Sequence, residues 1–308
     1  SYVRRDGKQT YKPHFTAHGF RYVKVENWPE DVAPEAFAAI AVYSDMNPLG
    51  DFTSSDGLLN QVVENTRWSQ KGNFLDIPTD CPTRERAGWT GDIAVFAETG
   101  GYLMDISRFL TKWLKDLALQ QEPDGRVASI VPDVGMFGYM DGSAGWADAA
   151  VIVPYTLYRM YGNIDVLAAQ YESMEKWLSF VQNRARKSGL LSRHRRSPYR
   201  ELIVDTGYHW GEWLEPGHVM GKDVIRNTFV PDAEVATACF AYSAGLLAEI
   251  AEILGKPDDA ATYAELSRKV KEAYRHAFTN NGLVESTRQC RYVRPVALDL
   301  LPEEDKVR

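Results

Sequence analysis

The sequence has few cysteines and no excess of positive charge. Its 308 residues include 3 cysteines, and 42 acidic residues outnumber 35 basic ones, which gives a formal net charge of -7. Cys81, Cys239 and Cys290 lack metal-ligand spacing and fit three unpaired thiols, which favours a reducing, cytoplasmic compartment. The chain begins at Ser1 without a signal-peptide pattern and fits a piece of a longer protein, so export stays open. The negative charge argues against a nucleic-acid partner, because such proteins present a basic face.

Several motifs of known chemistry are also missing. No apolar run is long enough to cross a bilayer without charges, so no membrane partner is expected and the protein should be soluble. There is no glycine-rich phosphate loop, nucleophile elbow or Ser-His-Asp set. His209 and His218 lie in an irregular stretch that does not match zinc-ligand spacings. We therefore expect no metal site and no cofactor.

What the sequence does contain is a long series of helical patterns. After residue 50, apolar residues recur at steps of three and four, which predicts amphipathic helices. Glycine at 255 followed by Pro257 and Asp258 marks a short link between two of them. Helices joined by short links pack as antiparallel neighbours, so a mainly α fold of the α/α-toroid type is predicted. The expected helices are 58–68, 93–119, 147–161, 166–185, 233–254, 260–278 and 289–300.

The first 50 residues and three long links differ from the helical part. Alternation over 19–26 and a short apolar run at 40–43 predict strands, so residues 1–50 are assigned as a β segment. That segment is either the end of a β-sandwich or a linker before the helical domain at 51–308. The Gly- and Pro-rich links carry aromatic and acidic residues, which is typical of loops that line a pocket. These links are 72–91, 122–146 and 188–231.

Residues 80–92 hold the densest group of polar side chains. Asp80, Arg84, Glu85, Trp89 and Asp92 stand among one proline and two glycines, which indicates a shaped polar loop. An apolar helical pattern follows at once, so Asp92 is expected at or near a helix N-terminus. Carboxylates and guanidinium groups bind sugar hydroxyls, and an indole ring covers an apolar sugar face. A structural network of ion pairs is the alternative interpretation.

The segment 73–92 (NFLDIPTDCPTRERAGWTGD) resembles the catalytic-domain signature of the bacterial and fungal α-L-rhamnosidases. Those enzymes are inverting glycoside hydrolases with an (α/α)6 barrel, so the resemblance implies an enzyme that releases terminal α-L-rhamnose. The implied partner is a rhamnose-containing glycoside or oligosaccharide, and the oligomeric state is not predicted. Shorter stretches that also resemble the family are 15–25, 50–56, 131–133, 145–154 and 211–214.

The resemblance also implies roles for the residues of the loop. Glu85 takes the position of the general acid, Asp80 and Asp92 take positions that hold sugar hydroxyls, and Arg84 and Trp89 take sugar-contacting positions. Neighbouring carboxylates raise the pKa of a carboxyl group and keep it protonated, as a general acid requires. The two arginines of the loop act in the opposite direction, and a buried Arg–Glu pair is the structural alternative.

Five residues further along resemble positions of the pocket wall, namely Trp146, Asp148, Trp210, Glu212 and Trp213. Trp146 is expected to stack on the sugar, although a tryptophan beside a helix start is otherwise ordinary core. Trp210 and Glu212 form a second aromatic and acidic group. Many relatives carry Asp where this chain has Glu212, so hydroxyl contact is expected there with a different reach.

The resemblance also predicts what the chain lacks. In the family the general base is a glutamate in a segment downstream of everything present here, and an (α/α)6 barrel needs more helices than this chain supplies. An incomplete toroid without its general base is therefore expected, with feeble activity of the chain alone. Another inverting (α/α)6 glycosidase, acting on glucosides or trehalose-like substrates, and a noncatalytic carbohydrate-binding fragment are the alternatives.

Overall fold

The computed structural model describes residues 6–7, 9–28, 31–187, 192–213, 222 and 230–306. It confirms the mainly α fold. A short antiparallel hairpin, β1 (Phe74–Leu75) and β2 (Ile77–Pro78), follows the first helix. The helices are α1 (Gly57–Asn73), α2 (Thr90–Leu103), α3 (Ser107–Gln120), α4 (Ala149–Tyr161), α5 (Ile164–Ala185), α7 (Ala233–Ile253), α8 (Pro257–Phe278), α9 (Gln289–Ala297) and α10 (Glu303–Lys306).

The predicted helix boundaries rest on local signals that the structure confirms. The Asp56 carboxylate accepts hydrogen bonds from the backbone N–H groups of Leu58 and Leu59 at 2.8 and 3.4 Å, and so caps α1. Gly255 has a φ of 70°, which a glycine adopts without strain. Pro257 is the first residue of α8, where its missing N–H costs nothing.

One predicted helix is wrong: residues 93–119 form two helices. The backbone of Met104 is extended, with φ -146° and ψ 154°, and ends α2. The Tyr161 hydroxyl accepts from the Ile106 N–H at 3.2 Å and donates to the Met104 carbonyl at 3.3 Å, which satisfies backbone groups released by the break. Because a residue 55 positions away stabilises the break, apolar periodicity alone does not reveal it.

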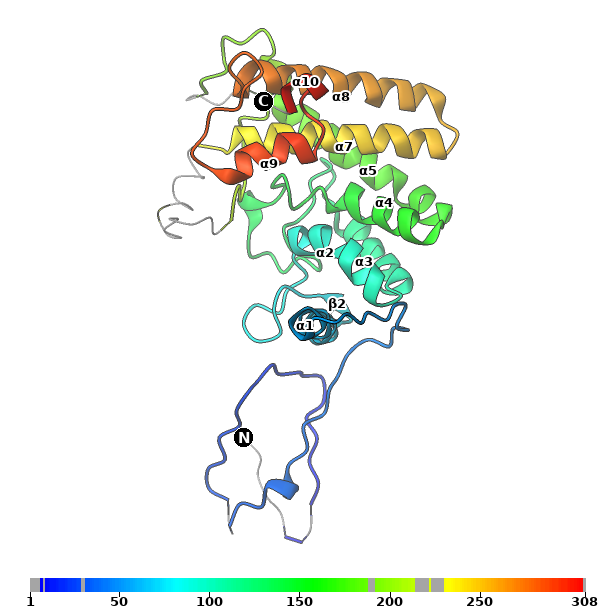
Figure 1. Cartoon of the computed structure of the whole chain (residues 1–308), viewed down its shortest axis with the longest axis vertical. Coiled ribbons are helices and arrows are strands. Elements are labelled where there is room, and N and C mark those ends of the chain that lie inside the picture. Colours follow the sequence, from blue (N-terminus) through cyan, green and yellow to red (C-terminus); the bar gives the residue numbers. More distant parts are fainter. Residues whose placement is uncertain are drawn as a thin grey trace.

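The two predicted strands, 19–26 and 40–43, are not formed among the described residues. Both segments are irregular, and β-bridging in this part of the chain is limited to the isolated pair Pro48 and Met104. A strand requires a ladder of bonds to a partner backbone. In the segment 19–26 the structure shows one such bond, from the Gly19 N–H to the Pro82 carbonyl at 3.1 Å. Figure 1 shows the N-terminal part extending away from the helices. Many of its apolar side chains, such as Phe20 and Tyr22, are exposed.

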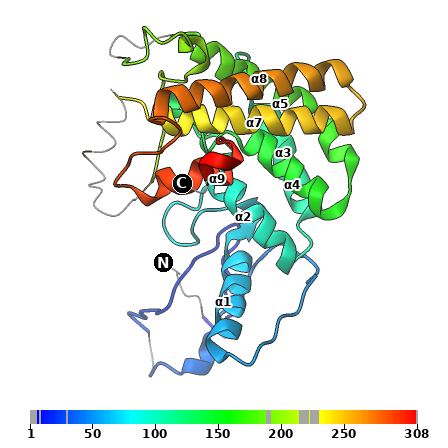
Figure 2. The same ribbon diagram turned by 45° about the horizontal axis from the view of Figure 1, so that its top comes forward.

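The helices form two layers. In one layer α2 packs against α4 and α4 packs against α7, while α3, α5 and α8 cover these helices as a second layer. The most extensive pairing is α7 with α8, which lie side by side in Figures 1 and 2. Large side chains such as Trp113, Trp177 and Phe240 are fully buried in the core. The inner helices α2, α4 and α7 are therefore neighbours, and the candidate site is built from residues at their ends.

Helix α7 is the one described helix that is long and apolar enough to cross a membrane by length and composition. Its mean hydropathy over the best window is 1.2, and 61% of that window is buried inside the fold. The charge-free stretch of α7 lies between Glu234 and Glu249, so α7 agrees with the expectation that charges interrupt the long apolar patterns. Its packing against α4, α5 and α8 accounts for its apolar character, since a helix that is covered on several sides needs few polar residues.

Candidate active site

Backbone hydrogen bonds shape the polar loop at 80–91. The Asp80 N–H donates to the Ala87 carbonyl, and the Ala87 N–H donates to Asp80 Oδ1, both at 3.1 Å, so the loop closes on itself. The loop then docks on residues 129–131, where the Val131 N–H donates to the Gly88 carbonyl at 2.8 Å. A Cβ atom at Gly88 would lie 2.0 Å from the Val131 carbonyl oxygen, so only glycine allows this close approach.

Glu85 is exposed on this loop and is held by a tryptophan. The Trp89 indole Nε1–H donates to Glu85 Oε2 at 2.7 Å, and the Glu85 backbone N–H points to the Cys81 sulfur at 3.3 Å. Arg86 turns away and donates to the Ala17 carbonyl at 2.9 Å. Within the described ranges no ion pair joins Glu85 to an arginine of the loop, so the buried Arg–Glu pair considered above is not formed. Arg84 is likewise exposed.

Asp92 lies in the first turn of α2, as predicted, and it titrates unusually. Its pKa is raised to about 6, mainly because surrounding protein atoms desolvate the carboxylate and also because the charges of Asp80 and Glu85 lie nearby, whereas a backbone hydrogen bond acts in the opposite direction. The side chain still reaches solvent. The structure therefore brings three predicted site residues, Asp80, Glu85 and Asp92, into one electrostatic environment.

The predicted tryptophans meet in one aromatic cluster next to this loop. Trp210 is its centre, with ring centroids 5.4 Å from Trp89, 6.1 Å from Trp146 and 5.2 Å from Trp213. Trp210 is 6% exposed, whereas Trp213 is 44% exposed. Sequence reasoning missed two further rings of the cluster, because no local pattern distinguishes them from core or loop aromatics. They are Phe137 and Tyr208.

The cluster lies at the N-terminal ends of inner helices. Trp89 is the N-cap residue of α2, and Trp146 lies two residues before Asp148, the N-cap residue of α4. The Trp146 ring lies against Gly91, where an added Cβ would be 2.7 Å from ring atoms. The positive end of the α2 dipole therefore lies beside Asp92, in the first turn of that helix.

His209 ties two tryptophan-bearing segments together. Its Nδ1 accepts from the Ala144 N–H at 3.0 Å, and its Nε2–H donates to the Thr206 carbonyl at 3.1 Å. Burial lowers the pKa of His209 to about 3, so the ring is neutral. His218 lies outside the described residues. In the described part of the chain, no group of three His, Cys, Asp or Glu side chains could hold a metal ion.

Glu212 is engaged in an ion pair rather than free. Its carboxylate contacts the guanidinium of Arg294 from α9. Arg294 also contacts Glu234 in the first turn of α7. Sequence patterns do not predict these contacts, because they join residues far apart in the chain. Arg294 and Glu234, for example, are 60 positions apart.

Asp148 has a structural environment. It is 1% exposed and accepts hydrogen bonds from the Trp177 indole at 3.0 Å, the Ser243 hydroxyl at 2.5 Å and the Gly145 N–H at 2.7 Å. Both oxygens of the carboxylate are therefore hydrogen-bonded, as buried polar groups usually are. Asp148 therefore joins α4 to α5 and α7 beneath the tryptophans.

Two layers of helices, with carboxylates and tryptophans at the inner helix ends, place the helical part of the chain in the α/α-toroid class. The family model described as the bacterial alpha-L-rhamnosidase 6 hairpin glycosidase domain matches residues 47–308, and the bacterial alpha-L-rhamnosidase concanavalin-like domain matches residues 2–43. This chain belongs to the bacterial α-L-rhamnosidase family, as its resemblance implies.

Individual relatives agree with this assignment. A curated α-L-rhamnosidase of Streptomyces avermitilis is 39% identical over 303 residues, which cover 98% of this chain and 27% of the relative. The structure of α-L-rhamnosidase from Dictyoglumus thermophilum is 30% identical with a TM-score of 0.81, over 96% of this chain and 31% of that one. The crystal structure of the Streptomyces avermitilis enzyme complexed with L-rhamnose is 36% identical with a TM-score of 0.73, over 86% and 23% of the two chains. The chain thus spans about three tenths of the length of its curated relatives.

Proposed function

We propose that this chain forms the acid-bearing part of an enzyme that releases terminal α-L-rhamnose from glycosides by inverting hydrolysis. The observation that carries the proposal is the position of Glu85. Its carboxyl group is open to solvent, is oriented by the Trp89 indole, and lies near Asp80 and Asp92. Membership of the rhamnosidase family supplies the class of sugar.

Glu85 serves as the general acid in this proposal. Inverting hydrolysis needs a protonated carboxyl at the leaving oxygen and a carboxylate base about 6.5–9.5 Å away that activates water. The Trp89 N–H occupies Glu85 Oε2 at 2.7 Å, so the proton is carried on the other oxygen, Oε1. As the glycosidic C–O bond breaks, that proton passes to the departing oxygen and Glu85 is left ionised. We assign the acid and the binding groups to this chain and leave the base unassigned.

The other predicted residues bind the sugar ring. One oxygen of Asp80 closes the loop, which leaves the second for a sugar hydroxyl. Asp92 accepts from a hydroxyl in its ionised form, and Arg84 donates from the exposed side of the loop. Trp89, Trp146 and Trp210 provide the apolar surface against the ring carbons.

We also propose the domain division at residue 50. Residues 1–50 would be the end of a β-sandwich domain and residues 51–308 the helical domain. The separate family matches at 2–43 and 47–308 support this division. The exposed apolar side chains of the N-terminal part also support it, because strands of a sandwich bury such residues against a second sheet.

Calorimetry with sugars tests the proposal. The chain is titrated with L-rhamnose, D-glucose and trehalose, and the same titrations are made with Asp80→Ala. We expect L-rhamnose to bind best and Asp80→Ala to weaken it at least about tenfold, since one charge-assisted hydrogen bond is lost. Preference for glucose or trehalose would favour another α/α-toroid glycosidase. Absence of binding to all three sugars would refute the proposal.

A further inference from the structure

A buried arginine connects the tryptophan-bearing segment to the helices behind it. The side chain of Arg294 is 10% exposed and contacts the carboxylates of both Glu212 and Glu234. Glu234 is 4% exposed and receives a second hydrogen bond, at 2.5 Å, from the Tyr274 hydroxyl of α8. Arg294 therefore joins an irregular segment to α7, α8 and α9 through one guanidinium. We call the group formed by Glu212, Arg294, Glu234 and Tyr274 the arginine bridge.

The segment held by the arginine bridge carries two rings of the aromatic cluster. Glu212 stands between Trp210 and Trp213, whose centroids are 5.2 Å apart. On the side of Trp210 the segment is fixed by neutral contacts, the Trp210 N–H donating to the Ser143 hydroxyl at 3.0 Å. On the side of Trp213 the described residues show the ion pair of Glu212 with Arg294 and the ring contact of Trp213 with Trp210. Loss of Arg294 would therefore release one side of the segment.

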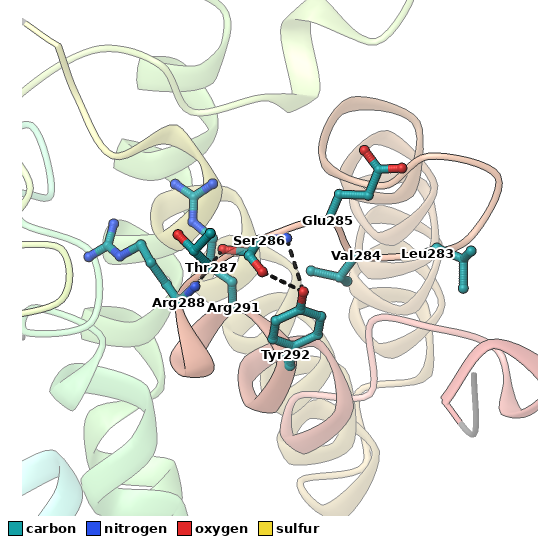
Figure 3. Close-up of a pocket in the computed structure, with 8 residues that line it drawn as sticks. All are labelled: Leu283, Val284, Glu285, Ser286, Thr287, Arg288, Arg291 and Tyr292. Carbon is teal, nitrogen blue, oxygen red and sulfur yellow. Dashed lines mark hydrogen bonds between the residues drawn. The ribbon is translucent and has the colours of Figure 1, made fainter.

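The position of Arg294 is itself fixed. Figure 3 shows the residues that lead into α9, where the Tyr292 hydroxyl accepts from the Ser286 N–H at 3.1 Å and donates to the Ser286 carbonyl at 2.5 Å. These two bonds pin the start of α9 to the preceding loop. Planar guanidinium groups on a fixed backbone hold carboxylates in a defined geometry, which a flexible ammonium group does less well.

We propose that Arg294 is a positioning residue of the sugar site: acting through Glu212, it holds Trp210 and Trp213 where they contact the sugar. Arg294 itself touches no substrate. This inference rests on the proposed function and gives Glu212 a different task from hydroxyl contact. It also explains why a charged pair is retained at a place that apolar residues could fill, since such pairs often specify one geometry.

The test compares Arg294→Met, Arg294→Lys and Glu212→Gln with the unaltered chain. Affinity for L-rhamnose is measured by calorimetry, and the change in tryptophan fluorescence on adding the sugar reports the rings directly. We expect Arg294→Met to weaken binding on the order of tenfold or more, because a small misplacement of binding groups has a large effect. Arg294→Lys should restore part of the affinity, and a double variant with Glu212→Gln should be no weaker than Arg294→Met alone.

Arg291→Met is the matched control. It removes the same charge one turn earlier on α9, where the side chain is 37% exposed and 3.9 Å from Glu234. We expect the affinity of Arg291→Met for L-rhamnose to stay within about twofold of that of the unaltered chain.

If Arg294→Met does not fold, Glu212→Gln alone carries the test, and unchanged affinity and fluorescence of Glu212→Gln would overturn the inference. If the unaltered chain binds rhamnose and Asp80→Ala abolishes binding while Arg294→Met does not weaken it, only this inference fails. If the unaltered chain binds no rhamnose, the proposed function fails and this inference fails with it.

Discussion

Acidification from pH 7 to pH 5 is expected to weaken L-rhamnose binding about tenfold, through Asp92. The pKa of Asp92 is about 6 in the structure, against 3.8 for an ordinary aspartate. At pH 7 about nine tenths of the side chains are then ionised, and at pH 5 about one tenth. If the ionised form accepts a sugar hydroxyl, the affinity follows that fraction, which corresponds to about 1.4 kcal/mol. With an ordinary pKa the ionised fraction at pH 5 would still exceed about nine tenths.

Calorimetric titrations with L-rhamnose between pH 5 and pH 8 measure this dependence. The matched control is Asp92→Asn, which should bind more weakly at pH 7 and show no transition near pH 6. Replacing Asp80 by Asn removes one of the charges that raise the pKa of Asp92 and should move the midpoint to lower pH. An affinity that does not change between pH 7 and pH 5, or an identical transition in Asp92→Asn, would refute the reasoning.

Three further predictions concern the acid, the support beneath the site and the position of one ring. Glu85→Gln should bind L-rhamnose within about threefold of the unaltered chain, because a proton donor contributes little to ground-state binding; a much larger loss by calorimetry would argue against the acid role. Asp148→Ala should lower the free energy of unfolding by about 3 kcal/mol in urea titrations, because three buried donors lose their acceptor. Gly91→Ala should weaken rhamnose binding, because the new Cβ would displace the Trp146 ring, whereas Gly72→Ala on α1 meets nothing within 4 Å and should not.

Much of the helical fold is predictable because it is encoded locally. Apolar spacing, the cap at Asp56 and the link around Gly255 place most helices close to their observed bounds. The break between α2 and α3 is not predictable in this way, because the Tyr161 hydroxyl that supports it comes from a distant helix. The N-terminal strands fail for a related reason, since strand formation depends on a partner that local sequence does not describe.

The candidate site is predictable where its residues are close in sequence. Asp80, Glu85, Trp89 and Asp92 fall within one loop and the helix turn after it, so composition and resemblance identify them together. The arginine bridge joins positions up to 82 residues apart, and no spacing rule connects such partners. Arg294 and Glu234, taken alone, would be assigned to a solvated surface.

The two-layer packing of the helices also divides the molecule into a working end and a remote end. The tryptophans and carboxylates lie where α2 and α4 begin, whereas the turn after α4, at Gly162–Asn163, and the turn after α7, at residues 254–256, lie where helices finish. Exposed turns tolerate inserted residues when their backbone carries few tertiary hydrogen bonds. A fluorophore, an affinity tag or a surface-immobilisation peptide spliced into either turn should leave sugar recognition intact, which offers a way to attach this protein to a sensor.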